Sequence, residues 1–409
     1  MSRDVSSKPA ANVSIPAVPA ETQPLAGMLK RLQRGELGQL PVVLTILIIA
    51  VYFQIASGGF FLVPRNLSNL TLQIATIGTL ALGAVLVLLI GEIDLSLAAV
   101  SNLCGATMVV LSVYHGWPAI PALLAGMAVG LAIGALNGFF VAVLGVPSFI
   151  VTLAGFIFYS GLLLHVLLPN TTIRLIDPTL TGIATTYVTF PWDAMIPVPI
   201  IAIYIGAMLW NRTARKNHGL EVNSLAEMWL QAGVVIVLTI GAVTLFESAY
   251  GVPYSTLVLV SLIAIFWLIM RFTGFGRHIY AVGGNSEASR RAGINVTMVR
   301  IAVFSLASML AGIGGILESS RTISASAQVS NTLLLNAIAA AVIGGVSLFG
   351  GRGSVWAVVL GVLVIGSLAN GLTLLGQSDD IQLMVEGAVL LVAVTADALA
   401  RRRNARTGR

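Results

Sequence analysis

The sequence contains little charge. Of its 409 residues, only 9% are Asp, Glu, Lys or Arg, whereas 57% are hydrophobic. Soluble domains carry about 25% charged residues, so this composition excludes an ordinary water-soluble protein. The mean hydropathy is +0.95, and apolar stretches of about 20 residues, enough to cross a bilayer, recur along the chain. We therefore predict an all-α polytopic membrane protein.

The sequence is also poor in the residue types that form catalytic and metal sites. Its single cysteine, Cys104, excludes an intrachain disulfide and lies in an apolar run, where cysteine usually serves as a packing residue. The four histidines have no metal-ligand spacing with one another or with Cys104, and no GxSxG or HExxH motif occurs. We therefore expect no metal, cofactor or catalytic residue, and an intramembrane enzyme is an alternative without candidate residues.

Lysine is scarce as well. The three lysines, Lys8, Lys30 and Lys216, do not follow a glycine, whereas a phosphate-binding loop of the form GxxxxGK[ST] requires that order. The chain is therefore not expected to hydrolyse ATP through such a loop. If it takes part in active transport, the energy must come from another subunit or from an ion gradient.

Twelve apolar stretches are predicted to cross the membrane. If the chain begins inside, 19 of the 22 Lys and Arg residues lie in cytoplasmic segments or at their edges, and only Arg65, Arg174 and Arg321 lie outside. This is the positive-inside pattern, so the net charge of +6 indicates orientation in a bacterial inner membrane rather than nucleic-acid binding. Gly78 and Gly83 suggest a break or kink in the second stretch. The predicted spans are 42–60, 67–90, 96–114, 119–144, 149–168, 194–211, 228–247, 254–271, 299–318, 332–349, 354–376 and 381–400.

The chain is expected to have three parts. Residues 1–40 form a polar, proline-containing cytoplasmic tail that is disordered or lies on the membrane surface, residues 41–400 form the transmembrane domain, and residues 401–409 form a basic cytoplasmic tail. The predicted cytoplasmic segments between spans are 91–95, 145–148, 212–227, 272–298 and 350–353.

An ion-coupled carrier is one hypothesis for such a chain, because those carriers bury ionisable groups in the membrane as relay sites. Most acidic residues lie at the ends of spans, but Glu386 lies about five residues into the last span, roughly 7 Å deep at the helical rise. It is therefore the candidate ion-coupling residue. The simpler interpretation, which we favour, is a carboxylate near the interface that is hydrated or paired within the bundle.

The most informative segment is 272–298. Asn285 or Ser286 can cap the start of a short helix, Glu287 suits the positive end, Arg290 suits the negative end, and Gly293 can end the helix in a left-handed conformation. A short, rigid helix between two spans is suited to inserting into a groove on another protein. On spacing alone, an ordinary interfacial loop is an equal alternative.

Three motifs resemble the permeases of ABC sugar transporters of the ribose/xylose class. In 283–294 the pattern GGN, small residues, Arg and AGI matches the coupling loop of those permeases. Residues 91–97 (GEIDLSL) resemble their GGIDLSVG segment, with Glu92 in place of a glycine. Residues 335–353 (LNAIAAAVIGGVSLFGGRG) resemble their LDAIAAVVIGGTSL run, with Asn336 where Asp is usual. The resemblance covers about 65–400. Two additional spans near 194–247, with a basic loop between them, resemble the xylose branch.

The resemblance implies a type II ABC-importer-like permease with inverted repeats. Its expected partners are a cytoplasmic ATPase dimer, a second permease copy, most simply an identical one, a periplasmic sugar-binding protein and a monosaccharide such as xylose or ribose. The segment expected to couple to the ATPase comprises Gly283, Gly284, Asn285, Ser286, Glu287, Ala288, Ser289, Arg290, Arg291, Ala292 and Gly293.

A neutral sugar is expected to follow a path of amide and hydroxyl groups rather than charges. The Asn-Gly pairs at Asn137 and Asn370 form a weak internal sequence repeat, and they lie in spans predicted to run in opposite directions, as inverted repeats require. Hydrogen bonding between helices explains these asparagines equally well. The candidates for the translocation path are Asn102, Asn137, Gln328, Asn331, Asn336 and Asn370.

The longest external segment is predicted to be 169–193. Together with 318–331 it is the candidate docking surface for the binding protein. A re-entrant plug or loop is an equal alternative.

Overall fold

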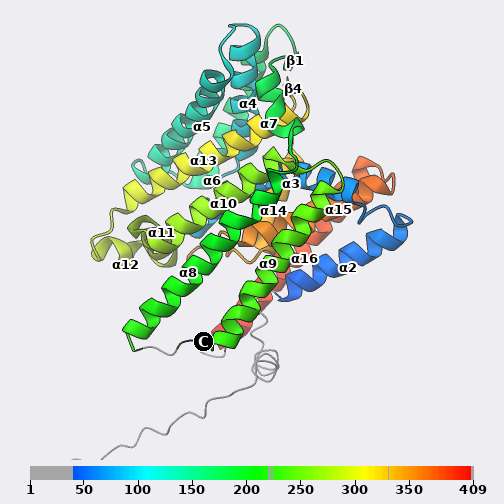
Figure 1. Ribbon diagram of the computed structural model, residues 1–409. Coiled ribbons are helices and arrows are strands. Elements are labelled where there is room, and N and C mark those ends of the chain that lie inside the picture. The colour runs from blue at the N-terminus through cyan, green and yellow to red at the C-terminus, as the bar shows by residue number, and fades with distance from the viewer. Residues whose placement is uncertain (1–39, 220–221, 223, 330, 407–409) are drawn as a thin grey trace, which may run out of the picture. The chain divides into compact units, whose positions relative to one another are not determined.

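The computed structural model describes residues 40–219, 222, 224–329 and 331–406, and helices dominate these residues (Figure 1). The first half contains α2 (Leu40–Ala56), α3 (Pro64–Leu89), α4 (Leu97–Val113), α5 (Ala119–Ala142), α6 (Ser148–Leu167), β1 (Thr172–Arg174), α7 (Pro178–Thr185), β2 (Tyr187–Val188), the 3-10 helix η1 (Asp193–Met195) and α8 (Pro197–Asn217). The second half contains α9 (Leu225–Glu247), β3 (Val252–Pro253), α10 (Tyr254–Phe272), α11 (Gly274–Gly284), α12 (Ser286–Arg291), α13 (Val296–Arg321), β4 (Ser324–Ser326), α14 (Asn331–Ile343), α15 (Ala357–Leu374) and α16 (Asp379–Arg406).

Each of the twelve predicted spans overlaps one of these helices. Within the described ranges, eight helices are long and apolar enough to cross a membrane, and α2, α4 and α14 are shorter apolar helices. The last predicted span, 381–400, lies in α16. This confirms an all-α polytopic membrane protein. The predicted tail 1–40 lies outside the described residues except for Leu40, and α16 extends to Arg406, through most of the predicted tail 401–409.

Helix α3 is the most buried of the long helices. Every residue from Thr79 to Leu89 is buried, and the helix packs against α10, α13, α14 and α15. The predicted break at Gly78 and Gly83 is wrong, because α3 is one continuous helix. A Cβ atom on Gly83 would lie 2.7 Å from the carbonyl oxygen of Ala307 in α13, so this glycine permits close helix packing.

Helices α5 and α13 pack through a row of glycines. Gly130, Gly134 and Gly138 recur every four residues on one face of α5. A Cβ on Gly130 would lie 2.7 Å from the Ser308 carbonyl oxygen, and one on Gly138 would lie 2.8 Å from the Ile301 Cα atom. Small residues at this spacing let membrane helices approach closely, where the gain comes from van der Waals packing.

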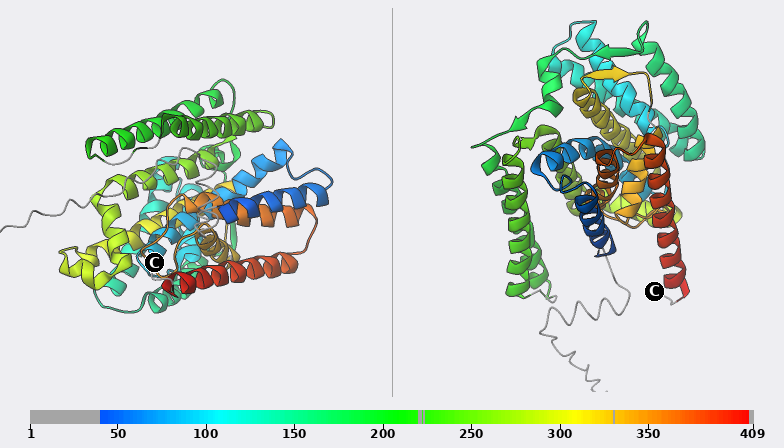
Figure 2. Two further views of the ribbon diagram at one scale, coloured as in Figure 1. Left: turned by 90° about the horizontal axis from the view of Figure 1, so that it is seen from below. Right: turned by 90° about the vertical axis from the view of Figure 1, so that its right-hand side faces the viewer.

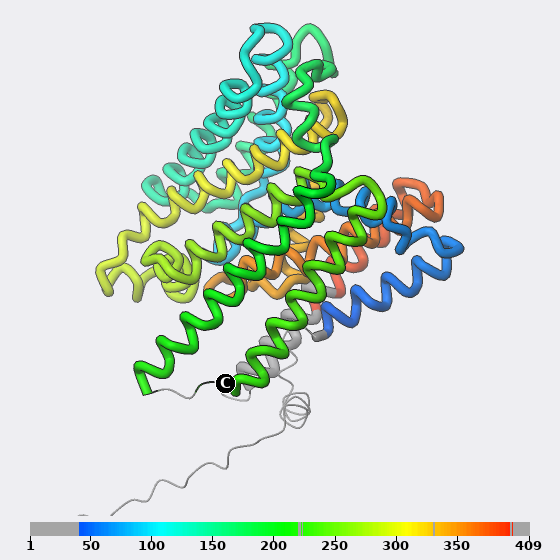
Figure 3. The backbone as a smooth tube through the Cα atoms, in the orientation of Figure 1, coloured from blue at the N-terminus to red at the C-terminus, as the bar shows by residue number. Residues whose placement is uncertain are grey.

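Helix α13 joins two ends of the bundle, as its yellow path in Figure 3 shows. At its start lie α11 and α12, which we call the α12 end. At its C-terminus begins a small antiparallel ribbon in which β4 pairs with β1, with Ile173 opposite Ala325; we call this the ribbon end. A second ribbon pairs β2 with β3, with Val188 opposite Val252.

Helices α8 and α9 lie side by side as a hairpin (Figure 2). They correspond to the two additional spans predicted near 194–247. Their apolar side chains are largely exposed, and their contacts with the rest of the bundle are few. The hairpin is therefore a peripheral addition to the bundle, and its exposed apolar surface suits lipid.

Candidate functional site

The segment between α10 and α13 consists of two capped helices. The Thr273 side chain accepts a hydrogen bond from Gly276 N at the start of α11, and the Asn285 side chain accepts one from Ala288 N at the start of α12. Gly293 has φ +87° and donates from its N–H to the Arg290 carbonyl. The sequence thus predicted the caps of α12 correctly. It missed α11, whose glycines give a weak helical signal.

Helix α12 presents charged side chains to the surroundings. Arg290 is exposed, and Arg291 and Glu287 form an ion pair of 3.3 Å in which both side chains stay mostly exposed. Ser289 faces inward and donates from its hydroxyl to the Asn285 carbonyl at 2.9 Å. A pair with such exposure contributes little to stability, so the charges of α12 are available for contact with another molecule.

The end of α11 sits in a contact that we call the glycine junction, formed by Gly91, Gly283, Gly350 and Gly351. The Gly351 N–H donates to the Leu89 carbonyl at 2.9 Å. A Cβ on Gly283 would overlap that same carbonyl oxygen, and one on Gly350 would lie 2.8 Å from the Gly91 nitrogen. Three chain segments therefore meet backbone to backbone, which only glycine permits.

Further contacts anchor the same region. The Tyr280 hydroxyl of α11 donates to the Gly353 carbonyl at 3.0 Å. At the other side of α12, Arg300 in α13 forms an ion pair of 3.1 Å with Glu92, and the two side chains are only 25% and 16% exposed. Because Glu92 stands where the resembled motif has glycine, this bridge is a feature of the present sequence. The segment is thus tied to the loop after α14 through Tyr280 and to loop 90–96 through Arg300.

Loop 90–96 continues into a buried polar chain. The Ser96 backbone N–H and hydroxyl donate to Asp94 Oδ1 at 2.8 and 2.6 Å, Asn137 Nδ2 donates to Ser96 Oγ at 3.1 Å, and the Tyr159 hydroxyl donates to Asn137 Oδ1 at 2.8 Å. Burial raises the pKa of Asp94 to about 6, although the hydrogen bonds from Ser96 oppose the shift. Among the described residues, Asp94 Oδ2 has no partner.

Of the predicted path residues, Asn137 and Asn370 hold helices together. Asn137 is 2% exposed within the chain just described, and Asn370 is 3% exposed and accepts from Asn66 Nδ2 at 2.9 Å. Asn336 is buried beside Glu386, to which its side chain hydrogen-bonds. The side chain of Asn331 lies outside the described part of the chain. These contacts match the alternative in which the asparagines make bonds between helices.

The other two predicted path residues, Asn102 and Gln328, line a cavity near the ribbon end. Asn102 Nδ2 donates to the Gln328 carbonyl at 2.9 Å. The cavity encloses about 810 Å³, within the range of roughly 300–1,000 Å³ typical of small-molecule sites. It is lined by Gln73, Thr76, Ile77, Asn102, Gly315, Glu318, Ser319, Arg321, Thr322, Ser324, Ala325, Ser326, Gln328, Val329, Leu333 and Thr373.

One charged pair lies in this cavity. Arg321 Nη2 and Nε donate to Glu318 Oε1 and Oε2 at 2.7 and 3.1 Å, and the Thr76 hydroxyl donates to Glu318 Oε2 at 3.2 Å. The expectation that a path would hold only amides and hydroxyls did not identify this pair. Its i, i+3 spacing was the available signal, since it places both side chains on one face of α13.

The turn at the rim of the cavity is strained. Ile323, between α13 and β4, has φ +53°, which is unfavourable for a β-branched residue and costs about 1–3 kcal/mol. Its carbonyl accepts from Leu175 N at 3.0 Å. The contact with Leu175, directly after β1, therefore holds a backbone conformation that places Thr322 and Ser324 at the cavity wall.

The segments 169–193 and 318–331 meet at the ribbon end. Besides the pairing of β1 with β4, the Ser320 hydroxyl donates to the Leu180 carbonyl at 2.7 Å and accepts from Ala184 N at 2.9 Å. Asp177 caps α7 by accepting from Leu180 N at 3.0 Å. The sequence predicted these segments as one surface, and the structure brings them together.

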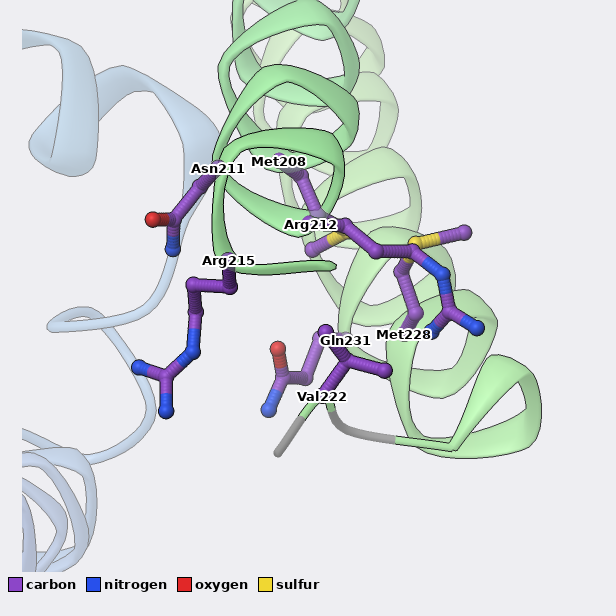
Figure 4. A pocket seen from close by; sticks show the side chains of 7 residues that line it. All are labelled: Met208, Asn211, Arg212, Arg215, Val222, Met228 and Gln231. Atoms are coloured by element: carbon purple, nitrogen blue, oxygen red, sulfur yellow. The ribbon is translucent and has the colours of Figure 1, made fainter. Parts of the chain in front are cut away.

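A smaller cavity of about 120 Å³ lies between the end of α8 and the start of α9 (Figure 4). It is lined by Met208, Asn211, Arg212, Arg215, Val222, Met228 and Gln231. It belongs to the peripheral hairpin and shares no lining residue with the larger cavity. In the part of the chain that the structure describes, no group of three or more His, Cys, Asp or Glu residues is arranged to hold a metal ion.

The chain matches known transport proteins over most of its length. Residues 66–394 match the family described as branched-chain amino acid transport system / permease component. The chain is 38% identical to the xylose transport system permease protein of Haemophilus influenzae, over 87% of this chain and 95% of that protein. The corresponding Escherichia coli protein is 35% identical, over 93% and 97%.

The ribose import permease protein of Bacillus subtilis is 32% identical, over 82% of this chain and 86% of that protein. No solved structure matches the chain. The resemblance to ribose and xylose permeases inferred from the three motifs is thereby confirmed. The chain belongs to this family of membrane-embedded permease components of transport systems.

Proposed function

We propose that the chain is the membrane subunit of an ATP-driven importer of a monosaccharide, with a pentose such as xylose as the first substrate to test. The relatives named for xylose and ribose support the substrate class. The observation that carries the proposal is α12, a short charged helix braced against the bundle and exposed on its other side. Such an element is built to receive force from a separate protein.

The ATPase dimer would contact the exposed residues of α12. Glu287, Ala288, Arg290 and Arg291 are exposed there, whereas Gly283 faces the Leu89 carbonyl. Gly283 would therefore transmit force rather than bind the ATPase. Phe349, 73% exposed beside the glycine junction, offers an apolar contact on the same surface.

The glycine junction would carry the motion of α12 into the bundle. Close-packed backbones cannot slide without clashing, so a shift of α11 must displace the end of α3 and the turn at Gly350. The Arg300–Glu92 bridge and the Asp94 chain extend this connection to α5 and α6. A displacement at α12 would thus reach helices that do not touch the ATPase.

The same proposal assigns each end of the bundle to one side of the membrane. The segments 91–95, 272–298 and 350–353, each predicted to be cytoplasmic, contact one another at the α12 end. We place that end, with residues 1–40 and 401–409, in the cytoplasm. The ribbon end, with 169–193 and 318–331, would face the periplasm and a sugar-binding protein. A second copy of the chain would complete the membrane unit.

Asn102 and Gln328 stay in the proposed translocation path because they line the larger cavity. We assign Asn137, Asn336 and Asn370 a different role, that of connecting helices, because their side chains hydrogen-bond other parts of the bundle. Glu386, the residue of the ion-coupled alternative, is 8% exposed and bonded to Asn336. A paired carboxylate of this kind has a structural role without an ion.

Proteoliposomes containing the chain, its ATPase and its binding protein test the proposal. We expect uptake of D-xylose or D-ribose that requires ATP on the side of the membrane to which the ATPase is bound. This uptake should not respond to an imposed proton or sodium gradient. Gradient-driven uptake by the chain alone, without ATPase, would establish the carrier alternative instead.

A further inference from the structure

We infer that the cavity near the ribbon end is a low-affinity monosaccharide site whose binding groups are Glu318, Arg321 and Thr76. This inference rests on the proposed function and adds a location and a recognition chemistry to it. The site would receive sugar at the ribbon end. It does not depend on the residues of the glycine junction, which lie at the α12 end, beyond the C-terminus of α3, whereas the cavity residues of α3 lie near its middle.

The hydrogen-bonding capacity of the pair exceeds what the described part of the chain uses. The guanidinium of Arg321 has five N–H donors, and two of them bond Glu318. Among the described residues, three donors therefore remain, together with a carboxylate lone pair on Oε1, and both side chains are about one third exposed. Sugar hydroxyls both donate and accept, so adjacent hydroxyls match this combination.

The rest of the lining supports a neutral, hydrophilic ligand. Gln73, Asn102, Gln328 and Thr373 add amide and hydroxyl groups around the pair. Because Glu318 and Arg321 compensate one another, the cavity offers no net charge for a sugar acid or an amino sugar. The ligand class is therefore an uncharged polyol.

The lining also explains why binding would be weak. Among the described residues that line the cavity, there is no Phe, Tyr or Trp on which a sugar ring could stack. A conducting site must let its ligand leave, so favourable but modest binding suits a path. The volume of about 810 Å³ leaves room for water around a monosaccharide.

Helix α3 connects this site to the proposed coupling end. Thr76 and Leu89 lie in the same continuous helix; Thr76 lines the cavity, and the Leu89 carbonyl contacts the glycine junction. Thirteen residues of α-helix separate them by roughly 20 Å. A displacement of α3 at Leu89 would therefore move the Thr76 hydroxyl relative to Glu318 on α13, which alters the site without a separate gate.

Two conservative variants and one matched control test the inference. Glu318→Gln removes the carboxylate charge, and Thr76→Val removes the hydroxyl without changing the shape. Thr79→Val is the control, since Thr79 lies one turn further along α3, donates to the Ala75 carbonyl within the same helix and does not line the cavity. Uptake of D-xylose and D-ribose is measured in the complete importer, and saturation-transfer NMR measures binding of the same sugars to the chain alone.

We expect Glu318→Gln to lower both sugar binding and uptake about tenfold, and Thr76→Val about threefold, because hydrogen bonds to charged groups are the stronger ones. Thr79→Val should match the wild type. Association with the ATPase serves as the folding readout for each variant. Wild-type binding and uptake in Glu318→Gln and Thr76→Val would overturn the site. If the wild-type importer takes up no sugar with ATP, the proposed function fails instead.

Discussion

The C-terminus of α3 and its middle have different kinds of surroundings. At Leu89, the helix meets Gly283 and Gly351 through backbone atoms, with no side chain between them. At Thr76, the helix meets a cavity of polar side chains that includes Glu318 and Asn102. The first arrangement transmits displacement because it cannot yield, and the second can rearrange its hydrogen bonds as a ligand enters. One rigid helix thus joins a mechanical contact to a binding surface.

The largest effect is expected at the glycine junction. Gly283→Ala adds a methyl group that overlaps the Leu89 carbonyl oxygen, whereas Gly284→Ala enters open space. Overpacking of about 1–3 kcal/mol should reduce uptake in the complete importer by roughly 5- to 150-fold, with ATPase association retained. Both substitutions make the same chemical change in one helix, so equal uptake by the two variants would contradict a transmitting role for Gly283.

The exposed side of α12 gives the next effect. Arg290→Glu reverses a charge on the proposed ATPase surface without touching the bundle. We expect the affinity for the ATPase to fall about tenfold, measured by quantitative pull-down from detergent at low and high salt. Lys216→Glu makes the same reversal at the peripheral hairpin and should leave the affinity unchanged. Normal binding by Arg290→Glu would argue against docking at α12.

The buried chain behind the junction should respond to pH. Burial raises the pKa of Asp94 from 3.8 to about 6, so the folded protein binds this proton more tightly than the unfolded chain does. The contribution of Asp94 to stability therefore falls as pH rises from about 4 to 6, by at most roughly 3 kcal/mol. Asp94→Asn keeps an oxygen to accept from Ser96 and should remove this dependence.

Thermal unfolding in detergent between pH 4 and pH 7.5 measures the difference between the wild type and Asp94→Asn. We expect the variant to gain relative stability as the pH rises and to match the wild type near pH 4. A constant difference across this range would show that Asp94 does not titrate there.

The smallest effect is expected at Glu386 in α16, which belongs neither to the glycine junction nor to the cavity lining. Glu386→Gln keeps an amide that can bond Asn336, so ATP-driven uptake should change less than about twofold, as expected for conservative changes away from a site. Loss of uptake together with lost dependence on an ion gradient would favour the carrier hypothesis. Thermal unfolding of the variant separates lost transport from lost folding.

The fold was largely accessible from sequence because it rests on local signals. Apolar length and the distribution of Arg and Lys define the spans, and caps such as Asn285 and Gly293 define α12. The glycine junction was not accessible, because Gly91, Gly283 and Gly351 are far apart in the chain and a glycine alone does not reveal what approaches it. The break predicted at Gly83 failed for the same reason.

The site was accessible only in part. Asn102 and Gln328 were identified as polar residues in apolar surroundings, and both line the cavity. Asn137 and Asn370 carried the same signal but bond other helices. Sequence does not say which face of a helix turns toward a cavity, and it gave no reason to expect the compensated pair of Glu318 and Arg321 in a path for a neutral sugar.

The most direct measurement is the reactivity of an Asn102→Cys variant with an impermeant thiol reagent applied from the ribbon side, with the ATPase free or trapped in its ATP-bound form. The native Cys104 is fully buried, so its background reaction should be low. We predict that trapping the ATPase changes the labelling rate at position 102 several-fold and that Gly283→Ala abolishes this response. A labelling rate that does not depend on the state of the ATPase would contradict coupling between the two ends.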